Sequence, residues 1–266
     1  MKKLEKTMKT LLTTAIVAAV TSIANAGDTG MINPDTIFGS GNANGSFTIN
    51  SDHGIEIGIR GKLRYNTAGN PSPTYNWDGV DTYSFAPSAS NPPAGRGMFN
   101  FDWSVNSNVD GTGDNLSAFK YELAMFKVDA DTGDISQSLH WDMINGADPT
   151  NGFIGYDHAI GDNSTLNDSG IEATSLSNYQ DLINDNNVAQ NSWNYGFFDG
   201  PGTGPLEGMD LNAIGTYVVR ITAFDQSGAE LVSTSININI VPLPSAAFAG
   251  LGMLGLVGGV RVMRRR

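Results

Sequence analysis

The stretch IEIGIRGKLRY, residues Ile55–Tyr65, decides how the rest of the chain can fold. Apolar or aromatic side chains stand at positions 55, 57, 59, 63 and 65, and charged residues or glycine stand at the others. This period of two is typical of a β-strand that has one face in a hydrophobic core and the other in water. We therefore expect Arg60, Lys62 and Arg64 on a solvated face, with contact to an anion or an acidic sugar as the functional alternative.

The same alternation recurs on both sides of that stretch, separated by loops rich in glycine, asparagine and proline. Strand patterns lie at residues 46–50, 82–85, 99–105, 119–128, 139–143, 188–198 and in a final hairpin over 215–240. A bulge is expected near Phe126, and residues 155–170 are expected to form a loop. Helical spacing occurs at 175–184. The pattern predicts an all-β single domain, a β-sandwich or jelly roll with one short helix.

The first 26 residues have the features of a secretory signal peptide. Four lysines precede an apolar run at 11–20, and Ala24 and Ala26 form a small-x-small cleavage site. We therefore expect export through the Sec translocon, removal of residues 1–26 by signal peptidase, and an extracellular domain over residues 27–240.

The composition of that domain limits which partners and which chemistry it can have. The chain has 15 Lys and Arg against 27 Asp and Glu, a formal net charge of −12, and more than half of its basic residues lie in the two terminal segments. So acidic a body disfavours nucleic acid and anionic lipid as partners. Cysteine is absent, which excludes disulfides and thiol nucleophiles. The body is nevertheless long enough to bury a core of ordinary size.

Residues 241–266, VPLPSAAFAGLGMLGLVGGVRVMRRR, join a double-proline motif, an uncharged apolar run and a cluster of arginines. The run is shorter than the roughly 20 residues of a stable membrane helix, and it is rich in glycine. Arginines at its end favour the cytoplasmic side of a membrane. We expect a transmembrane segment that holds the protein transiently in the inner membrane, with a permanent anchor as the alternative.

The order of these parts resembles the PEP-CTERM family of sorting signals, in its VPLPA-type form. The residues that carry the resemblance are Val241, Pro242, Leu243 and Pro244 of the motif and Arg264, Arg265 and Arg266 of the terminal cluster. Ser245 stands where that form usually has alanine. The resemblance implies sorting by an exosortase-like membrane protease and association with exopolysaccharide or biofilm matrix. Stretches of the domain such as GIEIGIRGKLRYN and FDWSVNSNVDG are also similar to those of uncharacterised PEP-CTERM surface proteins. This similarity implies kinship without implying any particular activity.

Metal sites have weak candidates in two Asp/Gly turns. Asp129, Asp131 and Asp134 place carboxylates as calcium requires, and the turn at 108–114 is similar, but neither completes a calcium-loop pattern. His53, His140 and His158 lack the spacing of a zinc site, so we expect them in loops or on the surface. We therefore expect no cofactor, with calcium as the alternative.

Two further alternatives concern saccharides. Trp77 lies between prolines, asparagines and glycines and is a candidate exposed platform for a glycan, as in a lectin-like carbohydrate-binding module. Glu56, Asp102 and Glu122 lie on the polar faces of three expected strands, could meet on one sheet, and could there supply the two facing carboxylates of a polysaccharide hydrolase. Our main expectation is a non-enzymatic protein with a structural or adhesive role at the cell surface or in the extracellular matrix.

Overall fold

The computed structural model describes residues 30–39, 42–128, 132–133, 135–146, 157–198 and 214–241 of the 266-residue chain. The expected signal peptide with Ala24 and Ala26, and the tail residues from Pro242 to Arg266, lie outside the described residues. So do the calcium candidates Asp129, Asp131 and Asp134. Within the described part, no helix combines the length and the apolar character needed to cross a bilayer.

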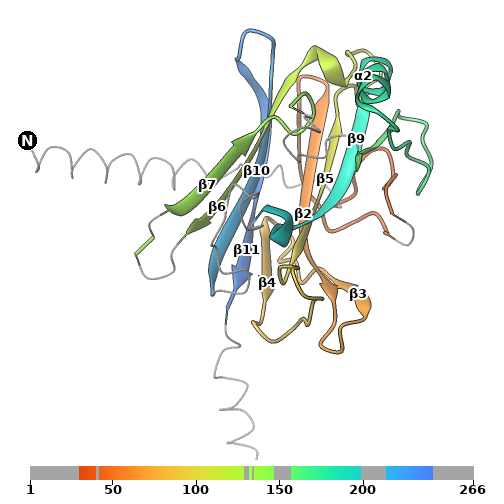
Figure 1. The fold of residues 1–266 in the computed structure, drawn as a ribbon. Helices are drawn as coiled ribbons and strands as arrows, with labels where there is room; N and C mark the ends of the chain where they lie inside the picture. Colours follow the sequence, from red (N-terminus) through yellow and green to blue (C-terminus); the bar gives the residue numbers. More distant parts are fainter. Residues whose placement is uncertain are drawn as a thin grey trace, which may run out of the picture.

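The described chain is mostly β and forms two sheets (Figure 1). The first sheet has the order β1 (Thr48–Asp52), β2 (Ile55–Tyr65), β5 (Asn100–Asn106), β9 (Val188–Asn194) and β8 (Ala159–Gly161), all antiparallel, with β3 (Pro71–Thr74) also paired to β2.

The second sheet has the order β4 (Thr82–Phe85), β11 (Glu230–Ile240), β10 (Gly215–Phe224), β6 (Lys120–Val128) and β7 (Ile135–Trp141). Its strands are antiparallel except that β4 runs parallel to β11. The described residues also form the short 3₁₀ turns η1 (Leu116–Ala118) and η4 (Tyr195–Phe198) and the helix α2 (Leu176–Asp185).

Helix α2 begins where the sequence predicts it. Ser175 has an extended backbone and its hydroxyl accepts a hydrogen bond from the Asn178 amide at 3.2 Å, which satisfies one of the first helical N–H groups. Tyr179 and Ile183, one turn apart, face the core. The expected all-β architecture with one short helix is therefore confirmed.

The main hydrophobic core lies between the two sheets. Ile57 and Ile59 from β2 and Trp103 from β5 meet Tyr217 and Ile238 from the second sheet, and all five are fully buried. Each such side chain stabilises the fold by about 1.5–3 kcal/mol through the apolar surface it removes from water. The period-two pattern places these residues on one face of each strand.

The other face of β2 differs from expectation. We expected it to be solvated, but Glu56, Arg60 and Lys62 are buried there, and Arg64 alone among the charged residues of β2 is exposed. The cause is the stretch before β1, which we call the lead-in segment (residues 30–39 and 42–47). It has no regular structure, and it covers this outer face with Ile32, Phe38 and Phe47.

Gly58 shows how closely the lead-in segment lies on the sheet. A Cβ at this position would be 2.5 Å from Cγ2 of Ile32, so the strand can approach the segment because it has no side chain here. The amide of Ile37 also donates to Oε1 of Gln190 on β9 at 2.8 Å. The lead-in segment is thus part of the folded layer structure.

Two strands escaped the sequence patterns. Strand β3 was not predicted because it contains Pro71 and Pro73, and proline donates no backbone hydrogen bond and is rare inside sheets. The strand is accommodated because it lies at the edge of the sheet and is wholly exposed. Strand β8 has three residues, too few to show a period, and it lies inside the stretch expected to be a loop. The expected bulge in β6 occurs as a register shift between Lys127 and Val128.

Candidate functional site

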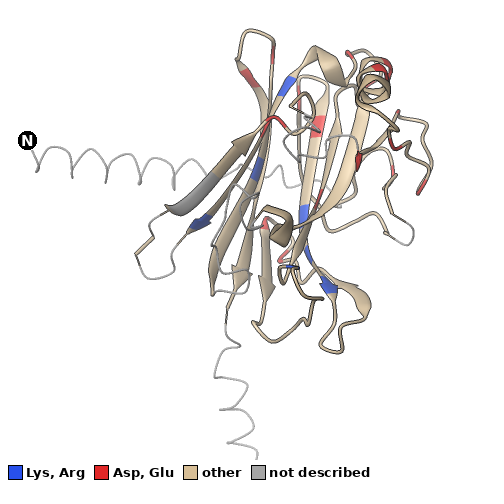
Figure 2. Cartoon of the chain, viewed as in Figure 1, with Lys and Arg blue, Asp and Glu red and all other residues tan. Residues whose placement is uncertain are grey.

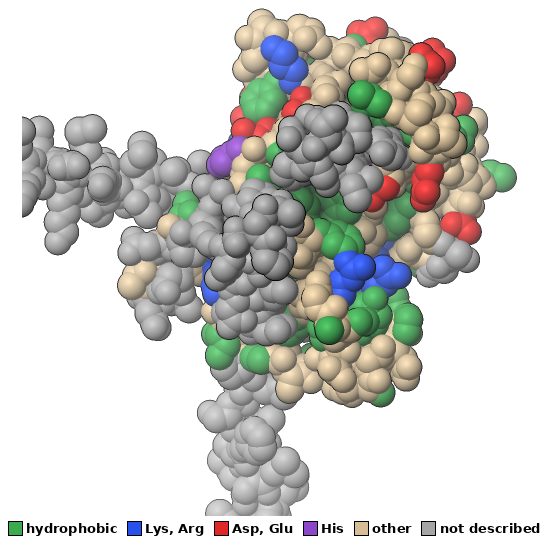
Figure 3. Space-filling model, in the orientation of Figure 1, with side chains coloured by type: hydrophobic (Ala, Val, Ile, Leu, Met, Phe, Trp, Pro, Cys, Tyr) green, Lys and Arg blue, Asp and Glu red, His purple; other side chains and the backbone are tan. Residues whose placement is uncertain are grey.

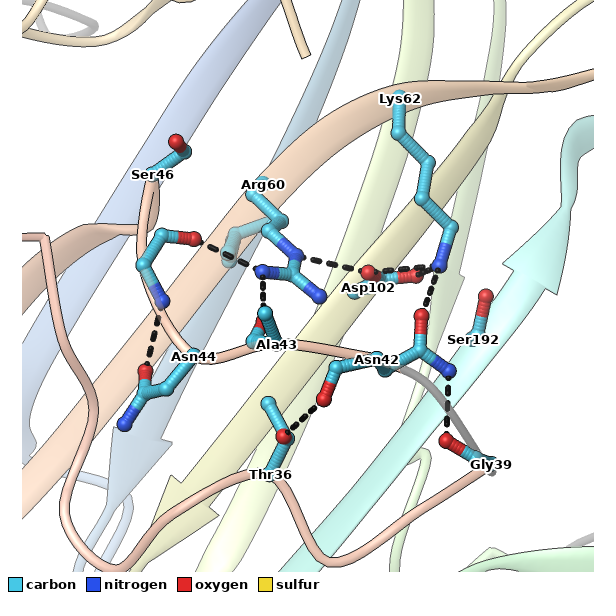
Figure 4. A network of polar contacts seen from close by, with 12 residues as sticks. Thr36, Gly39, Asn42, Ala43, Asn44, Ser46, Arg60, Lys62, Asp102 and Ser192 are labelled. Atoms are coloured by element: carbon cyan, nitrogen blue, oxygen red, sulfur yellow. Dashed lines mark hydrogen bonds and ion pairs between the residues drawn. The ribbon is translucent and has the colours of Figure 1, made fainter. Parts of the chain in front are cut away.

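A buried ion cluster lies on the outer face of the first sheet, beneath the lead-in segment (Figure 4). It consists of Arg60 and Lys62 of β2 and Asp102 of β5. Arg60 and Asp102 stand opposite each other in the strand register, and Nε of Arg60 is 2.7 Å from Oδ2 of Asp102. Nζ of Lys62 is 2.8 Å from Oδ2 and 2.7 Å from Oδ1. The side chains of Arg60 and Asp102 are 0% exposed and that of Lys62 is 3% exposed.

Arg60 ties the ion cluster to the lead-in segment. Its Nη1 donates to the carbonyl oxygens of Ala43 at 2.8 Å and Gly45 at 2.7 Å. The Cζ atom of its guanidinium lies over the rings of Phe47 and Tyr75, at 4.2 and 4.5 Å from their centroids. A flat, weakly hydrated cation tolerates such a site better than an ammonium does.

Burial and charge oppose each other at Asp102. Burial alone raises the pKa of its carboxyl, but Lys62 and Arg60 outweigh burial and hold the pKa below its usual value. Burial lowers the pKa of Lys62, although the Asp102 carboxylate acts in the opposite direction. Asp102 is therefore ionised, while Lys62 gives up its proton more readily than an exposed lysine.

Lys62 also forms part of an open groove on the outer face. The groove has a volume of about 420 Å³. Its walls carry two cations, two carboxylates, amide and hydroxyl groups, and an aromatic and two proline rings: Lys62, Arg64, Asp157, Glu172, Asn42, Asn191, Ser192, Phe38, Pro71 and Pro73. Such a lining offers hydrogen-bond donors and acceptors beside flat apolar surface, which suits a polar ligand with several hydroxyl groups.

Acidic groups dominate the rest of the described surface. Asp and Glu residues gather along α2 and the neighbouring loops, whereas Lys and Arg residues are scattered along the strands (Figure 2). On the face shown in Figure 3, Asp and Glu side chains gather toward the upper right. The groove, in which two cations stand beside two carboxylates, is therefore less acidic than the rest of the described surface.

Trp77 does not form an exposed platform. Its ring is half-buried, packs against the main core and stacks on Tyr83, with the ring centroids 6.4 Å apart and the planes at 14°. The space around it is so tight that a Cβ on Gly30 would lie 2.9 Å from the indole. Tyr83 therefore stacks on the Trp77 ring in the place where a glycan was expected to stack.

The three carboxylates considered for hydrolysis do not converge. Glu56 and Asp102 belong to the first sheet, whereas Glu122 lies on β6 in the second sheet. Glu56 accepts a hydrogen bond from the amide of Asn33 at 2.7 Å, and Asp102 is held by Arg60 and Lys62. We therefore correct the expectation that these side chains meet on one sheet.

The histidines divide into two groups. His53 and His140 are exposed, as expected, with side chains 58% accessible. His158 lies in a bend directly before β8, so it is in a loop as expected, but it is fully buried there. Its Nε2 lies 2.8 Å from the carbonyl oxygen of Met143, and its ring contacts Trp103 and Trp193. Among the described residues, no three His, Asp or Glu side chains are grouped to hold a metal ion.

The turn at 108–114 is stabilised by its own hydrogen bonds. Oδ1 of Asp110 accepts from the amide of Thr112 at 3.0 Å and from its hydroxyl at 2.8 Å, and these contacts lower the pKa of Asp110. This is the arrangement of an ordinary Asx turn.

Sequence reasoning missed the ion cluster although it singled out all three members. The signal lay in one carboxylate, Asp102, in an expected strand that otherwise carries apolar and neutral polar residues, and in the cations of the neighbouring strand. Comparisons of the sequence with protein-family models and with curated proteins found no match.

Proposed function

We propose that this chain is an exported, non-enzymatic β-sandwich protein of the cell surface or extracellular matrix, with a structural or adhesive role in exopolysaccharide or biofilm. It is flanked by a signal peptide over residues 1–26 and a sorting signal over residues 241–266. The Sec translocon and signal peptidase would handle the first segment. An exosortase-like membrane protease would process the second after transient anchoring in the inner membrane.

The observation that carries this proposal is the tail with its VPLP motif, apolar run and arginine cluster. The fold supports it at one point. Strand β11 ends at Ile240, directly before the motif, and Val241 is 41% exposed. The amide of Val241 donates to the carbonyl of Phe85 at 3.0 Å, and no described strand extends beyond it. Cleavage after the motif would leave both sheets whole.

The test is the C-terminus of the native protein, determined by mass spectrometry on material from the cell surface and the medium. Cells with and without the sorting protease are compared. We expect a C-terminus near residues 241–245 in normal cells and Arg266 retained in cells without the protease. Retention of Arg266 in the membrane fraction of normal cells would make the tail a permanent anchor and remove the main support for a matrix role.

A second candidate function is carbohydrate binding, and the groove favours it over the site expected at Trp77. The groove sets Arg64 beside the amide of Asn191 and the hydroxyl of Ser192, groups that suit the carboxylate and hydroxyls of an acidic saccharide. Arg64 is the exposed cation of this set, so reversing its charge leaves the buried ion cluster in place.

Calorimetry with neutral and uronate-containing oligosaccharides tests this candidate. We expect saturable binding of the acidic sugars by the unaltered protein and loss of this binding in Arg64→Glu. Arg96 lies outside the groove lining, so the control variant Arg96→Glu should retain the binding. Absence of binding by both classes of sugar would exclude the carbohydrate-binding function. It would leave the sorting proposal untouched.

A further inference from the structure

A lysine, an asparagine and an aspartate are in direct contact above the first sheet. Nζ of Lys62 lies 3.1 Å from Oδ1 of Asn42 and within 2.8 Å of both carboxylate oxygens of Asp102 (Figure 4). Lys62 and Asp102 come from neighbouring strands, whereas Asn42 belongs to the lead-in segment. An amine, a carboxamide and a carboxylate therefore converge from three parts of the chain.

The Asn42 side chain is held with its carbonyl oxygen toward the lysine. Its Nδ2 donates to the carbonyl oxygen of Gly39 at 3.0 Å and to that of Phe38 at 3.4 Å. Its backbone carbonyl accepts from Oγ1 of Thr36 at 2.6 Å. The carbonyl carbon is one bond beyond the oxygen that Lys62 contacts, so a small shift brings the amine onto it. Groups held this close react far faster than the same groups free in solution.

Charge also favours a reaction at this place. Arg60 and Lys62 share the one carboxylate of Asp102, so two buried cations face one buried anion. An uncompensated buried charge is costly. Acylation of Lys62 would remove its charge and leave Arg60 and Asp102 as a neutral pair. A desolvated lysine beside another cation is also the form in which lysine acts as a nucleophile.

We propose that Lys62 and Asn42 become joined by an isopeptide bond that forms within the folded protein, with Asp102 as the proton carrier. The bond would fasten the lead-in segment covalently across the outer face of β2. In a chain without cysteine it would serve as a permanent internal crosslink.

The step balances without any other reactant. The Lys62 ammonium transfers a proton to Asp102, and the resulting amine attacks Cγ of Asn42 to form the C–N bond. Asp102 gives this proton to Nδ2 as the Cγ–Nδ2 bond breaks, and it takes the second proton from Nζ. Ammonia leaves and accepts that proton. The products are a secondary amide and one ammonium ion, and nothing is oxidised or reduced.

Tryptic mapping of the full chain, unfolded before digestion, tests the proposal. In the unlinked protein, trypsin cuts after Arg60, Lys62 and Arg64. We expect no cut after Lys62 in the linked protein, and a branched product in which residues 61–64 are attached to the peptide that contains Asn42. Its mass should be the sum of the two peptides less one ammonia. Complete cleavage after Lys62, with Asn42 unmodified, would overturn the proposal.

Variants separate this bond from other losses of ammonia. Asparagine can also lose ammonia by closing on its own backbone, which leaves an unbranched peptide that is cut after Lys62, and that result would count against the crosslink. We expect Lys62→Met and Asn42→Ala to abolish the branched product. Asn44→Ala is the matched control, because Asn44 is also half-buried in the lead-in segment but bonds to Ile32, and it should retain the product.

Asp102→Asn tests the proton carrier, with Lys62 and Asn42 both present. We expect the branched product to be lost or to form much more slowly. Formation at the normal rate in this variant would remove Asp102 from the reaction. The digest of the unaltered protein decides the existence of the bond independently of how well this variant folds.

Discussion

Arg60 and Asp102 stand opposite each other on β2 and β5, and their side chains form an ion pair of 2.7 Å with no exposure to solvent. A buried ion pair contributes little net stability compared with apolar residues. Removing one partner is nevertheless costly, because the other charge then lacks that counter-charge in a buried site. This pair therefore positions the lead-in segment more than it strengthens the sheet. Its removal should nevertheless be costly, because Asp102 and two backbone carbonyls depend on Arg60.

We predict that Arg60→Met lowers the free energy of unfolding by about 1–3 kcal/mol, because Asp102 and the carbonyl oxygens of Ala43 and Gly45 lose the hydrogen bonds that Arg60 donates to them. Arg64→Met is the matched control on the same strand, and its exposed position predicts a change within about 0.5 kcal/mol. Urea unfolding followed by tryptophan fluorescence measures both. Equal effects of the two variants would contradict the buried role of Arg60.

We predict that Gly58→Ala and Gly61→Ala each destabilise the fold by about 1–3 kcal/mol, on opposite faces of β2. A Cβ at position 61 would lie 3.0 Å from Ile238 in the inner core, and a Cβ at position 58 would meet Ile32 of the lead-in segment. Adding Ile32→Ala should offset part of the cost of Gly58→Ala and none of the cost of Gly61→Ala. A double-mutant cycle by chemical denaturation detects this difference.

We predict that Ser175→Ala costs about 1 kcal/mol, because the first turn of α2 loses the acceptor for the Asn178 amide. Ser175→Asp supplies another acceptor and should restore most of the loss. Because α2 packs Tyr179 and Ile183 into the main core, the effect should appear in global unfolding. A loss of equal size in Ser175→Asp would show that capping is not the cause.

We predict that Asp225→Asn weakens the fold near neutral pH and that this difference shrinks in acid. Hydrogen bonds from the Ser227 hydroxyl and the Ala229 amide lower the pKa of the Asp225 carboxyl below its ordinary value of 3.8. A depressed folded-state pKa gives stability that is present above the unfolded value and is lost as the pH falls through the folded value.

The unfolding midpoints of the unaltered protein and of Asp225→Asn are measured at pH 6 and in steps below pH 4. They test whether the difference in stability shrinks as the pH falls. Asp110 and Asp162 have the same kind of shift and are unchanged in both proteins, so they cancel in the comparison. A difference that grows toward acid would mean that the charge of Asp225 opposes folding.

Much of the fold was predictable from local pattern. The period of two located most of the strands, since alternate side chains of a strand point to opposite faces whatever surrounds it. Helical spacing after Ser175 located α2 in the same way. Two strands lay outside this logic, because prolines obscure β3 and β8 is too short to show a period.

The candidate site was only partly predictable. Arg60, Lys62 and Asp102 each stood out in the sequence, but their relation did not. Alternation says that a residue faces away from the core between the sheets, and it cannot say whether another segment covers that face. The cover here is irregular chain, which has no periodic signature. The sequence therefore could not predict that these three charged side chains are buried and paired with one another.

Composition and local pattern were enough to predict the acidic domain, the absence of disulfides, the order of strands along the chain and the terminal segments on which the proposed destination rests. The tertiary structure alone decided that Trp77 pairs with Tyr83, that His158 is buried, that Glu122 lies apart from Asp102, and that Lys62 meets Asn42. The physical reason is that composition and periodicity are properties of neighbouring residues. Desolvation and contact between distant side chains exist only once the lead-in segment lies on the sheet.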